Sequence, residues 1–419
     1  MNIQEIQNEL SKCVKCGRCL AACPTYTVTR REGLSARGKL ALLEFELGGE
    51  ADLARRMKDL LSHCLQCGAC AEVCASDVHA DELIQVGRAL AVQDRGLADI
   101  QRLLARDVMK RGPLTRTAIK SRKLFLKNVP PESGLHFRFP LPGLDPERWL
   151  PPLAPRPFLD NLPPAHESPG KGPRVALFVG CVSNYLHPDT ARAAVSILEA
   201  AGARVYIPPS QVCCGKPAFG AGDMETAASL AQKNIAAFNP DEYDYLVAFC
   251  ATCSEQLKGY HRLEGVEVKG GWTDRIRAFS EFLVLLSDLN LQSEAEKEEP
   301  IRVFYHDPCH LRRKQGIYKE PRALLKALPG VELVGEDLPP ACCGYGGLFN
   351  LWHYDLSREI FKKRAETFIP LDPDVIVTSC SGCLLQFEDN IHRLGLRQKV
   401  SSLAEFIASQ VPVDGQKFK

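Results

Sequence analysis

The chain has 419 residues, too many for one hydrophobic core, so two or three domains are expected. A hydrophobic fraction of 45%, a charged fraction of 25% and a formal net charge of +1 fit a globular protein without a basic field for nucleic acid. No uncharged apolar run reaches the length of a membrane span, and the first ten residues lack the apolar core of a secretion signal. We therefore expect a cytoplasmic chain, free or peripherally attached to the inner face of the cell membrane.

All 18 cysteines sort into four groups. In a reducing compartment, clustered Cys-x-x-Cys spacings indicate metal or redox sites rather than structural disulfides. The groups are Cys13, Cys16, Cys19 and Cys23; Cys64, Cys67, Cys70 and Cys74; Cys181, Cys213, Cys214, Cys250 and Cys253; and Cys309, Cys342, Cys343, Cys380 and Cys383. The sequence thus predicts a protein that holds metal–sulfur centres.

Residues 1–110 are expected to form a mostly helical domain, with helical patterns over residues 37–61 and 81–109. Its two cysteine groups have the spacing Cys-x2-Cys-x2-Cys-x3-Cys of bacterial ferredoxins, in which the fourth cysteine ligates the other cubane [4Fe–4S] cluster. The predicted ligands are Cys13, Cys16, Cys19 and Cys74 for cluster one, and Cys64, Cys67, Cys70 and Cys23 for cluster two. A pair of zinc sites is the alternative, but zinc prefers four ligands in paired Cys-x-x-Cys units.

Residues 111–172 are expected to form a proline-rich linker or wrapping arm. The stretch 130–173 holds 13 of the 29 prolines, and proline lacks the N–H that helix interiors and central strands need. Four aromatic residues indicate that the arm packs on a surface, and its own chain is preferred over a partner. They are Phe137, Phe139, Trp149 and Phe158.

Residues 173–298 and 299–419 form an internal repeat. In both copies a strand-like run ends in a cysteine, an adjacent cysteine pair followed by glycine comes next, and a Cys-x-x-Cys unit closes the pattern. Each copy alternates short β-branched runs with helical patterns, which predicts an α/β domain with a largely parallel sheet. The cysteines follow the strands, so we expect them at the carboxyl edge of each sheet. The whole chain is then an α+β multi-domain protein.

The repeated pattern resembles the cysteine-rich "CCG" domain family. This resemblance implies that the five cysteines of each copy hold a noncubane [4Fe–4S] cluster. Five thiols are one more than a tetrahedral zinc site uses, although zinc or an empty redox-active thiol site stays open for either copy. Lys216 beside the first cysteine pair, against Tyr345 beside the second, would make the two sites electrostatically unequal.

Two ferredoxin-type runs followed by two CCG domains resemble three related proteins: the iron–sulfur subunit of glycolate oxidase, the C subunit of anaerobic glycerol-3-phosphate dehydrogenase, and the D subunit of heterodisulfide reductase. The local amino-acid sequences of residues 19–26, 35–39 and 63–70 most resemble those of the first of these proteins. This resemblance implies a protein that passes electrons from an FAD-binding partner, which oxidises glycolate or D-lactate, to a quinone or another carrier. No G-x-G-x-x-G follows a strand here, so substrate oxidation is expected on the partner.

Two other functions stay open. The chain could reduce a disulfide at a noncubane cluster, as the resemblance to heterodisulfide reductase implies, or it could be a redox sensor or scaffold whose CCG domains bind zinc. We expect four further residues to be loop residues satisfied by the backbone, rather than proton or hydrogen-bond donors at a cluster: His187, His306, Asp307 and His310. Five basic residues form a local cluster near the first cysteine run: Arg18, Arg30, Arg31, Arg37 and Lys39. We expect this cluster to be solvated; the other interpretation is that it docks to an acidic face of a flavoprotein.

Overall fold

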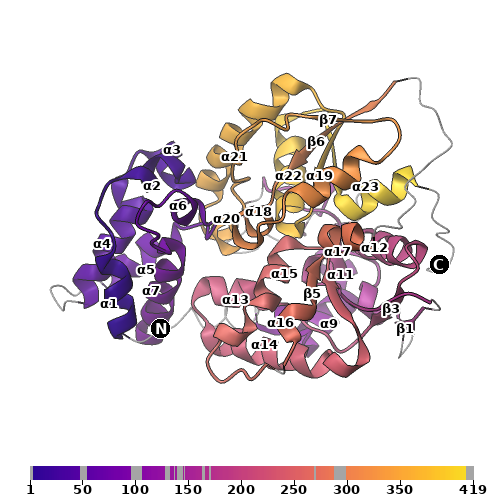
Figure 1. Cartoon of the computed structure of the whole chain (residues 1–419), viewed down its shortest axis with the longest axis horizontal. Helices are drawn as coiled ribbons and strands as arrows, with labels where there is room; N and C mark the ends of the chain where they lie inside the picture. Colours follow the sequence, from indigo (N-terminus) through magenta and orange to yellow (C-terminus); the bar gives the residue numbers. More distant parts are fainter. Residues whose placement is uncertain are drawn as a thin grey trace.

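A computed structural model gives the fold of the chain. It describes residues 3–47, 54–95, 106–127, 133–135, 137–138, 145, 147–162, 166–168, 171–268, 270–286 and 299–411. A helical lobe at the N-terminus is followed by two α/β lobes, each with a parallel sheet (Figure 1). The predicted fold class is confirmed. No helix among the described residues is long and apolar enough to cross a membrane.

The N-terminal lobe packs four longer helices around a small core, in which Leu43, Leu61 and Leu83 are fully buried. The described residues of the predicted helical stretch 37–61 are helical and belong to α4 and α5. The longer helices are α1 (Ile3–Ser11), α4 (Ala36–Leu47), α5 (Ala54–Ser62) and α7 (Ala80–Arg95). The cysteine runs lead into the short elements α2 (Arg18–Ala22), α3 (Pro24–Thr29), η1 (Glu32–Leu34) and α6 (Ala69–Glu72).

The first α/β lobe holds a five-stranded sheet of order β1-β3-β2-β4-β5, parallel except for β1. Its strands are β1 (His166–Glu167), β2 (Arg174–Phe178), β3 (Arg204–Ile207), β4 (Tyr245–Ala248) and β5 (Ile276–Ala278). Its helices are α11 (Cys181–Tyr185), α12 (Pro188–Ala200), α13 (Lys216–Ala221), α14 (Met224–Ala237), η4 (Pro240–Glu242), α15 (Ala251–Lys258), η5 (Tyr260–Arg262), α16 (Trp272–Arg275) and α17 (Phe279–Leu285).

The second α/β lobe repeats this order as a fully parallel sheet, β7-β6-β8-β9. Its strands are β6 (Ile301–His306), β7 (Val331–Val334), β8 (Val375–Thr378) and β9 (Lys399–Ser402). Its helices are α18 (Cys309–Gln315), α19 (Lys319–Lys326), α20 (Leu348–Trp352), α21 (Tyr354–Phe368), η6 (Ile369–Leu371), α22 (Ser381–Leu394) and α23 (Leu403–Gln410). The central strands are buried on both faces, as expected for parallel sheets covered by helices.

The two α/β lobes pack with a pseudo-two-fold relationship. Helix α12 contacts α23 while α17 contacts α19, and α15 contacts α18 while α11 contacts α22. In the repeat, α12 corresponds to α19 and α23 to α17, so the first two contacts are equivalent. Likewise α15 corresponds to α22 and α18 to α11, so the last two contacts are equivalent. This is the pattern of a self-complementary interface. Apolar residues from both lobes form one continuous core here, including Val175 of β2 and Val303 of β6. The carboxyl ends of the two sheets therefore face each other.

The stretch between the helical lobe and the first sheet packs on its own chain. The Trp149 backbone N–H donates to Asp389 Oδ1 at 2.9 Å, and the indole stacks on His392. Phe158 is buried, Phe137 bridges to Leu126, and Phe139 lies outside the described residues. The stretch is more ordered than a plain linker, because it also forms α9 (Pro113–Lys120), α10 (Arg122–Phe125), η3 (Phe158–Asp160) and β1. Strand β1 covers the edge of β3, which would otherwise present unpaired backbone groups.

Candidate metal centres

The eight cysteines of the helical lobe line two adjoining cavities. The first cavity is lined by Cys13, Cys16, Cys19 and Cys74 together with Cys70. The second is lined by Cys23, Cys64, Cys67 and Cys70. The fourth cysteine of each run thus lies with the first three of the other run, which is the grouping the ferredoxin pattern predicts. Because Cys70 borders both cavities, the two sites are immediate neighbours. Of the eight cysteines, Cys16 is the exposed one.

The first CCG site lies at the carboxyl edge of the first sheet. Cys181 begins α11 just after β2, Cys250 and Cys253 flank the start of α15 after β4, and the adjacent pair Cys213-Cys214 lies between β3 and α13. The Sγ atoms of Cys213 and Cys181 are 3.8 Å apart. Hydrogen bonds from Cys213 and Cys253 hold the pKa of Cys214 well below the usual thiol range. The site thus favours a thiolate at the second cysteine of the pair.

The second CCG site repeats this arrangement. Cys309 begins α18, Cys380 and Cys383 flank the start of α22, and the Cys343 and Cys383 Sγ atoms are 3.3 Å apart. Hydrogen bonds from Cys342 and Cys383 hold the pKa of Cys343 well below its usual range, as at the matching position of the first site. Thiolate is the form that binds metal, so in both copies the second cysteine of the adjacent pair is the one favoured in the metal-binding form.

The glycine after each cysteine pair has a structural reason. Gly215 and Gly344 have φ of +87° and +93°, in the left-handed region that disfavours side chains. A Cβ on Gly344 would also lie 2.5 Å from the carbonyl oxygen of Ser357 in α21. The backbone must therefore turn sharply and approach α21 closely for the two adjacent thiols to reach the site.

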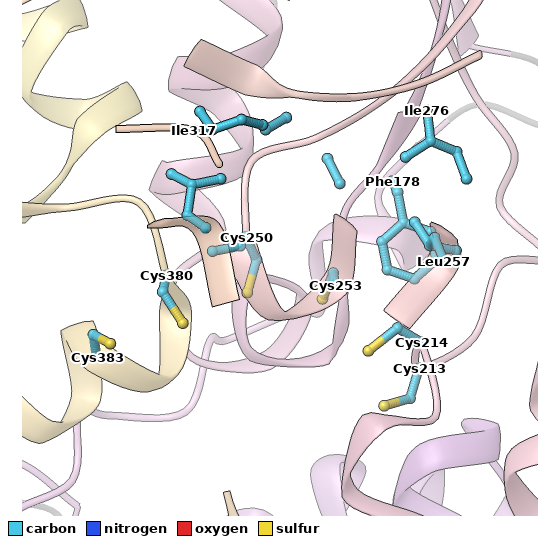
Figure 2. Packing of buried hydrophobic residues seen from close by; sticks show 14 of the residues in the cluster. Phe178, Cys213, Cys214, Cys250, Cys253, Leu257, Ile276, Ile317, Cys380 and Cys383 are labelled. Atoms are coloured by element: carbon cyan, nitrogen blue, oxygen red, sulfur yellow. The ribbon is translucent and has the colours of Figure 1, made fainter. Parts of the chain in front are cut away.

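Both CCG sites open into one cavity of about 340 Å³ that all ten of their cysteines line. The Ala251 backbone N–H donates to the Ser379 carbonyl oxygen at 2.8 Å across the lobe boundary, and the Thr252 hydroxyl lies 3.3 Å from the Cys380 Sγ. Figure 2 shows Cys250 and Cys253 of the first site beside Cys380 and Cys383 of the second. The pseudo-two-fold packing thus places two five-thiol sites face to face.

The helical lobe approaches the second CCG site more closely than the first. Cys67 lines the second cavity of that lobe, and it also packs in one cluster with Cys309 and Cys342. Arg313 bridges the junction, because its guanidinium contacts the Cys309 Sγ at 3.5 Å and the Glu72 carboxylate at 2.6 Å. An ion pair between Lys314 and Asp81 lies beside it. This contact breaks the symmetry between the two CCG sites.

Charged side chains also distinguish the two sites. Lys216, beside the first cysteine pair, forms an ion pair of 2.6 Å with Glu255. Burial alone would raise the pKa of Glu255, but the Lys216 ammonium lowers it to about 2. Burial, reinforced by the charge of Lys216, lowers the pKa of His310 to about 4. The residue that follows the second pair and its glycine is Tyr345, which lacks a charge, so the predicted electrostatic inequality has a structural basis.

The expectation of four loop residues satisfied by the backbone is partly wrong: His187 and Asp307 lie in loops, but side chains pair with them. His306 is the last residue of β6 and is fully buried, and His310 lies in α18 with its Nδ1 2.9 Å from the Thr252 hydroxyl. His187 pairs with Glu388 of the other α/β lobe, 3.1 Å away. Asp307 accepts two hydrogen bonds from Arg322. These partners come from distant parts of the chain, so spacing along the sequence gave no sign of them.

The predicted basic cluster is also partly wrong. Arg18, Arg30 and Arg31 lie at the surface, but Lys39 is buried and donates to the Leu34 carbonyl oxygen. Burial lowers its pKa, and its ammonium borders the cavity that contains Cys23 and Cys64. Other residues that sequence reasoning missed are Thr252, Arg313 and Arg88, the last of which donates to the Leu61, Ser62, Cys64 and Gly220 carbonyl oxygens.

The donor set suits iron–sulfur clusters. Thiolates dominate all four sites, and soft sulfur ligands select iron–sulfur clusters, zinc or Cu(I). Five converging thiols in each CCG site exceed the four of a tetrahedral zinc centre.

Comparisons with known proteins agree with this chemistry. Residues 9–78 match a 4Fe-4S dicluster domain, and residues 175–258 and 303–388 each match a Cysteine-rich domain. The chain is 30% identical, over 95% of its length and 92% of the relative's, to the "Probable glycolate oxidase iron-sulfur subunit" of Bacillus subtilis. The chain belongs to the glycolate oxidase iron–sulfur subunit family. It is therefore an iron–sulfur electron-transfer subunit.

Two further relatives widen the comparison. The B subunit of the fumarate reductase (CoM/CoB) of Methanothermobacter marburgensis is 28% identical, over 95% of this chain and 72% of that protein. The "Lactate utilization protein A" of an Exiguobacterium species is 29% identical, over 56% of this chain and 97% of that protein. The names of these relatives point to different substrates, so the family likeness alone does not select one.

Proposed function

We propose that this chain is the electron-transfer subunit of a flavin-dependent dehydrogenase that oxidises glycolate or D-lactate. An FAD-binding partner subunit would accept hydride from the 2-hydroxy acid, because such chemistry belongs to a flavin and this chain has no flavin motif. The two electrons of each turnover would then pass singly through this chain to a quinone or another carrier. A quinone acceptor would require the complex to bind the membrane surface peripherally.

The observation that carries this proposal is a continuous series of sulfur sites. It begins at the exposed Cys16, continues through Cys70, which borders both cavities of the helical lobe, and reaches Cys67 beside Cys309. It ends where Cys380 of the second CCG site lies beside Cys250 of the first in one buried cluster (Figure 2). A chain of adjoining redox sites from the surface to a buried cavity is what an electron relay requires.

We assign the ligands as the sequence predicts. Cubane clusters one and two take the swapped ferredoxin sets, and each CCG site takes its five cysteines for a noncubane [4Fe–4S] cluster, with zinc as the alternative at one of them. The proposed domains are residues 1–110, 111–172, 173–298 and 299–419. The adjoining cavities of the helical lobe support the swapped sets, and the separation of the strands into two sheets supports the last boundary.

The clusters, when bound, supply one-electron transfer. The protein supplies their environment. Burial of Cys214, Cys250, Cys343 and Cys380 limits the contact of these ligands with bulk solvent. The buried Lys39 ammonium and the Arg313 guanidinium place positive charge beside the cysteines of cluster two and of the second CCG site. Such charges and hydrogen bonds set the potential of a cluster, and the lobe packing sets the distances between clusters.

Co-purification from the native host tests the proposal. We expect a flavoprotein to be retained with the chain, and the complex to reduce an artificial acceptor with glycolate or D-lactate. A matched complex that carries Cys67→Ser should keep its flavin reduction by substrate but lose reduction of the acceptor. A flavin-free preparation that oxidises neither acid would contradict the proposal.

One observation favours a second function, the reduction of a disulfide. The two CCG sites face each other across a shared cavity with room beside the cysteines, and one relative is named as part of a fumarate reductase (CoM/CoB). Reduction of a thiol disulfide by the isolated chain, supplied with a low-potential electron donor, would favour this function over the first.

A further inference from the structure

The two CCG sites share five cysteines but differ at one buried position. The run from Arg174 to Cys181 aligns with the run from Arg302 to Cys309 without a gap. This alignment places Phe178, the last residue of β2, opposite His306, the last residue of β6. Both side chains are almost completely buried, at 1% and 0% exposed. The second site therefore has an imidazole where the first has a phenyl ring.

His306 lies against the thiols of the second site. A ring nitrogen of His306 and the Sγ atoms of Cys343 and Cys383 all lie within 4.8 Å of one another. The ring also packs on Phe387, with ring centroids 4.9 Å apart, and the Thr378 hydroxyl donates to the His306 carbonyl oxygen. Strand β6 and these contacts hold the imidazole in place.

Among the described residues, neither ring nitrogen of His306 has a hydrogen-bond partner, although both are buried. An unsatisfied buried donor costs about 1–3 kcal/mol, so a histidine here needs a function that a phenylalanine would not provide. The Cys343 and Cys383 sulfurs are the acceptors nearest to this imidazole, since both lie within 4.8 Å of one of its nitrogens.

The first site has no equivalent donor at the matching position. Phe178 packs on Phe238, with ring centroids 5.9 Å apart, and supplies no N–H. Two polar residues near the first cysteine pair, Asn234 and Tyr260, donate to the Cys213 and Cys214 carbonyl oxygens instead of to a sulfur. The two sites therefore differ in whether an imidazole lies beside the ligand sulfur atoms.

We propose that His306 donates an imidazole N–H to the Cys343 thiolate and thereby holds the reduction potential of the second CCG centre above that of the first. Hydrogen bonds to ligand sulfur stabilise the more negative, reduced state of a cluster. The inference rests on an iron–sulfur centre at the second site, which belongs to the proposed function, but not on the substrate. His306 is a positioning residue that acts through Cys343, and it would retain electrons at the site next to Cys67.

A reciprocal exchange between the two repeats tests this role. Redox titration of the isolated chain, followed by electron paramagnetic resonance, gives the potential of each centre, and Cys214→Ser and Cys343→Ser assign the signals. His306→Phe should lower the potential of the second centre, with iron content and the first centre unchanged. His306→Gln, which keeps an N–H donor, should restore part of the shift. Phe178→His should raise the potential of the first centre.

Three results would overturn the proposal. The first is an unchanged second-centre potential in His306→Phe with full iron content. The second is loss of iron from the second site in both His306→Phe and His306→Gln, which would make His306 a ligand or a packing residue. The third is zinc at the second site, which would also refute the proposed cluster there. If His306→Phe does not fold, an unchanged first centre in Phe178→His overturns the proposal. A complex that fails to oxidise glycolate or D-lactate would refute the proposed substrate, but these measurements of potential and iron content would still test the role of His306.

Discussion

The hydroxyl of Thr252 lies 3.3 Å from the Sγ of Cys380. Thr252 stands inside the Cys-x-x-Cys unit of the first α/β lobe, and Cys380 opens the same unit of the second. The same hydroxyl lies 2.9 Å from Nδ1 of His310. One side chain therefore joins the two CCG sites and a half-buried histidine, so a change in one lobe should alter the stability of its contact with the other.

Thr252→Val should destabilise the contact between the two α/β lobes. It removes the partner of His310 Nδ1, whose Nε2 is already buried without one, and an unmet buried group costs about 1–3 kcal/mol. Thermal unfolding of the cluster-loaded chain should show a lower Tm. Thr252→Ser keeps the hydroxyl and should remain close to the wild type; an equal loss in both variants would exclude the hydrogen bonds as the cause.

The fourth ligands of the cubane clusters should be exchanged between the two runs. Cys74 lies with the first run and Cys23 with the second, so Cys74→Ser should remove the signal of cluster one and Cys23→Ser that of cluster two. Each variant should lose up to about four irons per chain. Cys16→Ser and Cys64→Ser identify the two signals under either grouping, and the opposite assignment would show that each run ligates its own cluster.

Removing only one partner of the ion pair between Lys216 and Glu255 should lower the stability of the fold. The two side chains are only 12% and 16% exposed, so Lys216→Met leaves a buried carboxylate unpaired, at a cost of about 3–5 kcal/mol. The double variant Lys216→Met/Glu255→Gln should recover much of this stability, because no uncompensated charge remains. Denaturant unfolding of the four proteins in the cycle measures the effect, and simple additivity of the two changes would refute the coupling.

Stability should fall at alkaline pH through the pair of His187 and Glu388. Burial alone would lower the pKa of His187, but the hydrogen bond and charge of Glu388 raise it above its usual value of 6.5. The stabilisation is therefore complete below the unfolded pKa and is lost as the pH rises through the folded pKa. His187→Gln and Glu388→Gln should remove this component of the Tm difference between about pH 6 and pH 9. A pH dependence that persists in both variants would point to other groups.

Much of the candidate site could be predicted from the sequence because its chemistry is encoded locally. Cysteines three residues apart in a tight loop converge on one cluster whatever surrounds the loop, so the runs that begin at Cys13 and Cys64 can be recognised from spacing alone. The repeat also determined that Cys181 and Cys309 would follow equivalent strands, because alternating β-branched and helical patterns set the α/β order. The confirmed fold class rests on these short-range signals.

The neighbours of those cysteines could not be predicted in the same way. Lys39 was expected in a basic surface cluster, yet it is buried beside the cavity of Cys23, because α4 turns that side chain inward. His306 was expected to be satisfied by the backbone, yet the end of β6 aims it at Cys343. Burial of a single polar side chain depends on which elements cover it, and sequence spacing does not contain that information.

The sequence by itself therefore determined the kinds of centre, the repeat and the order of the lobes, since ligand chemistry and hydrophobic periodicity act over a few residues. The tertiary structure alone decided how the centres are connected. It places Cys67 against Cys309, turns the two CCG sites toward each other through Thr252 and Cys380, and gives the second site a buried imidazole where the first has a phenyl ring. These relationships depend on packing between helices far apart in the chain, where shape complementarity selects the partner.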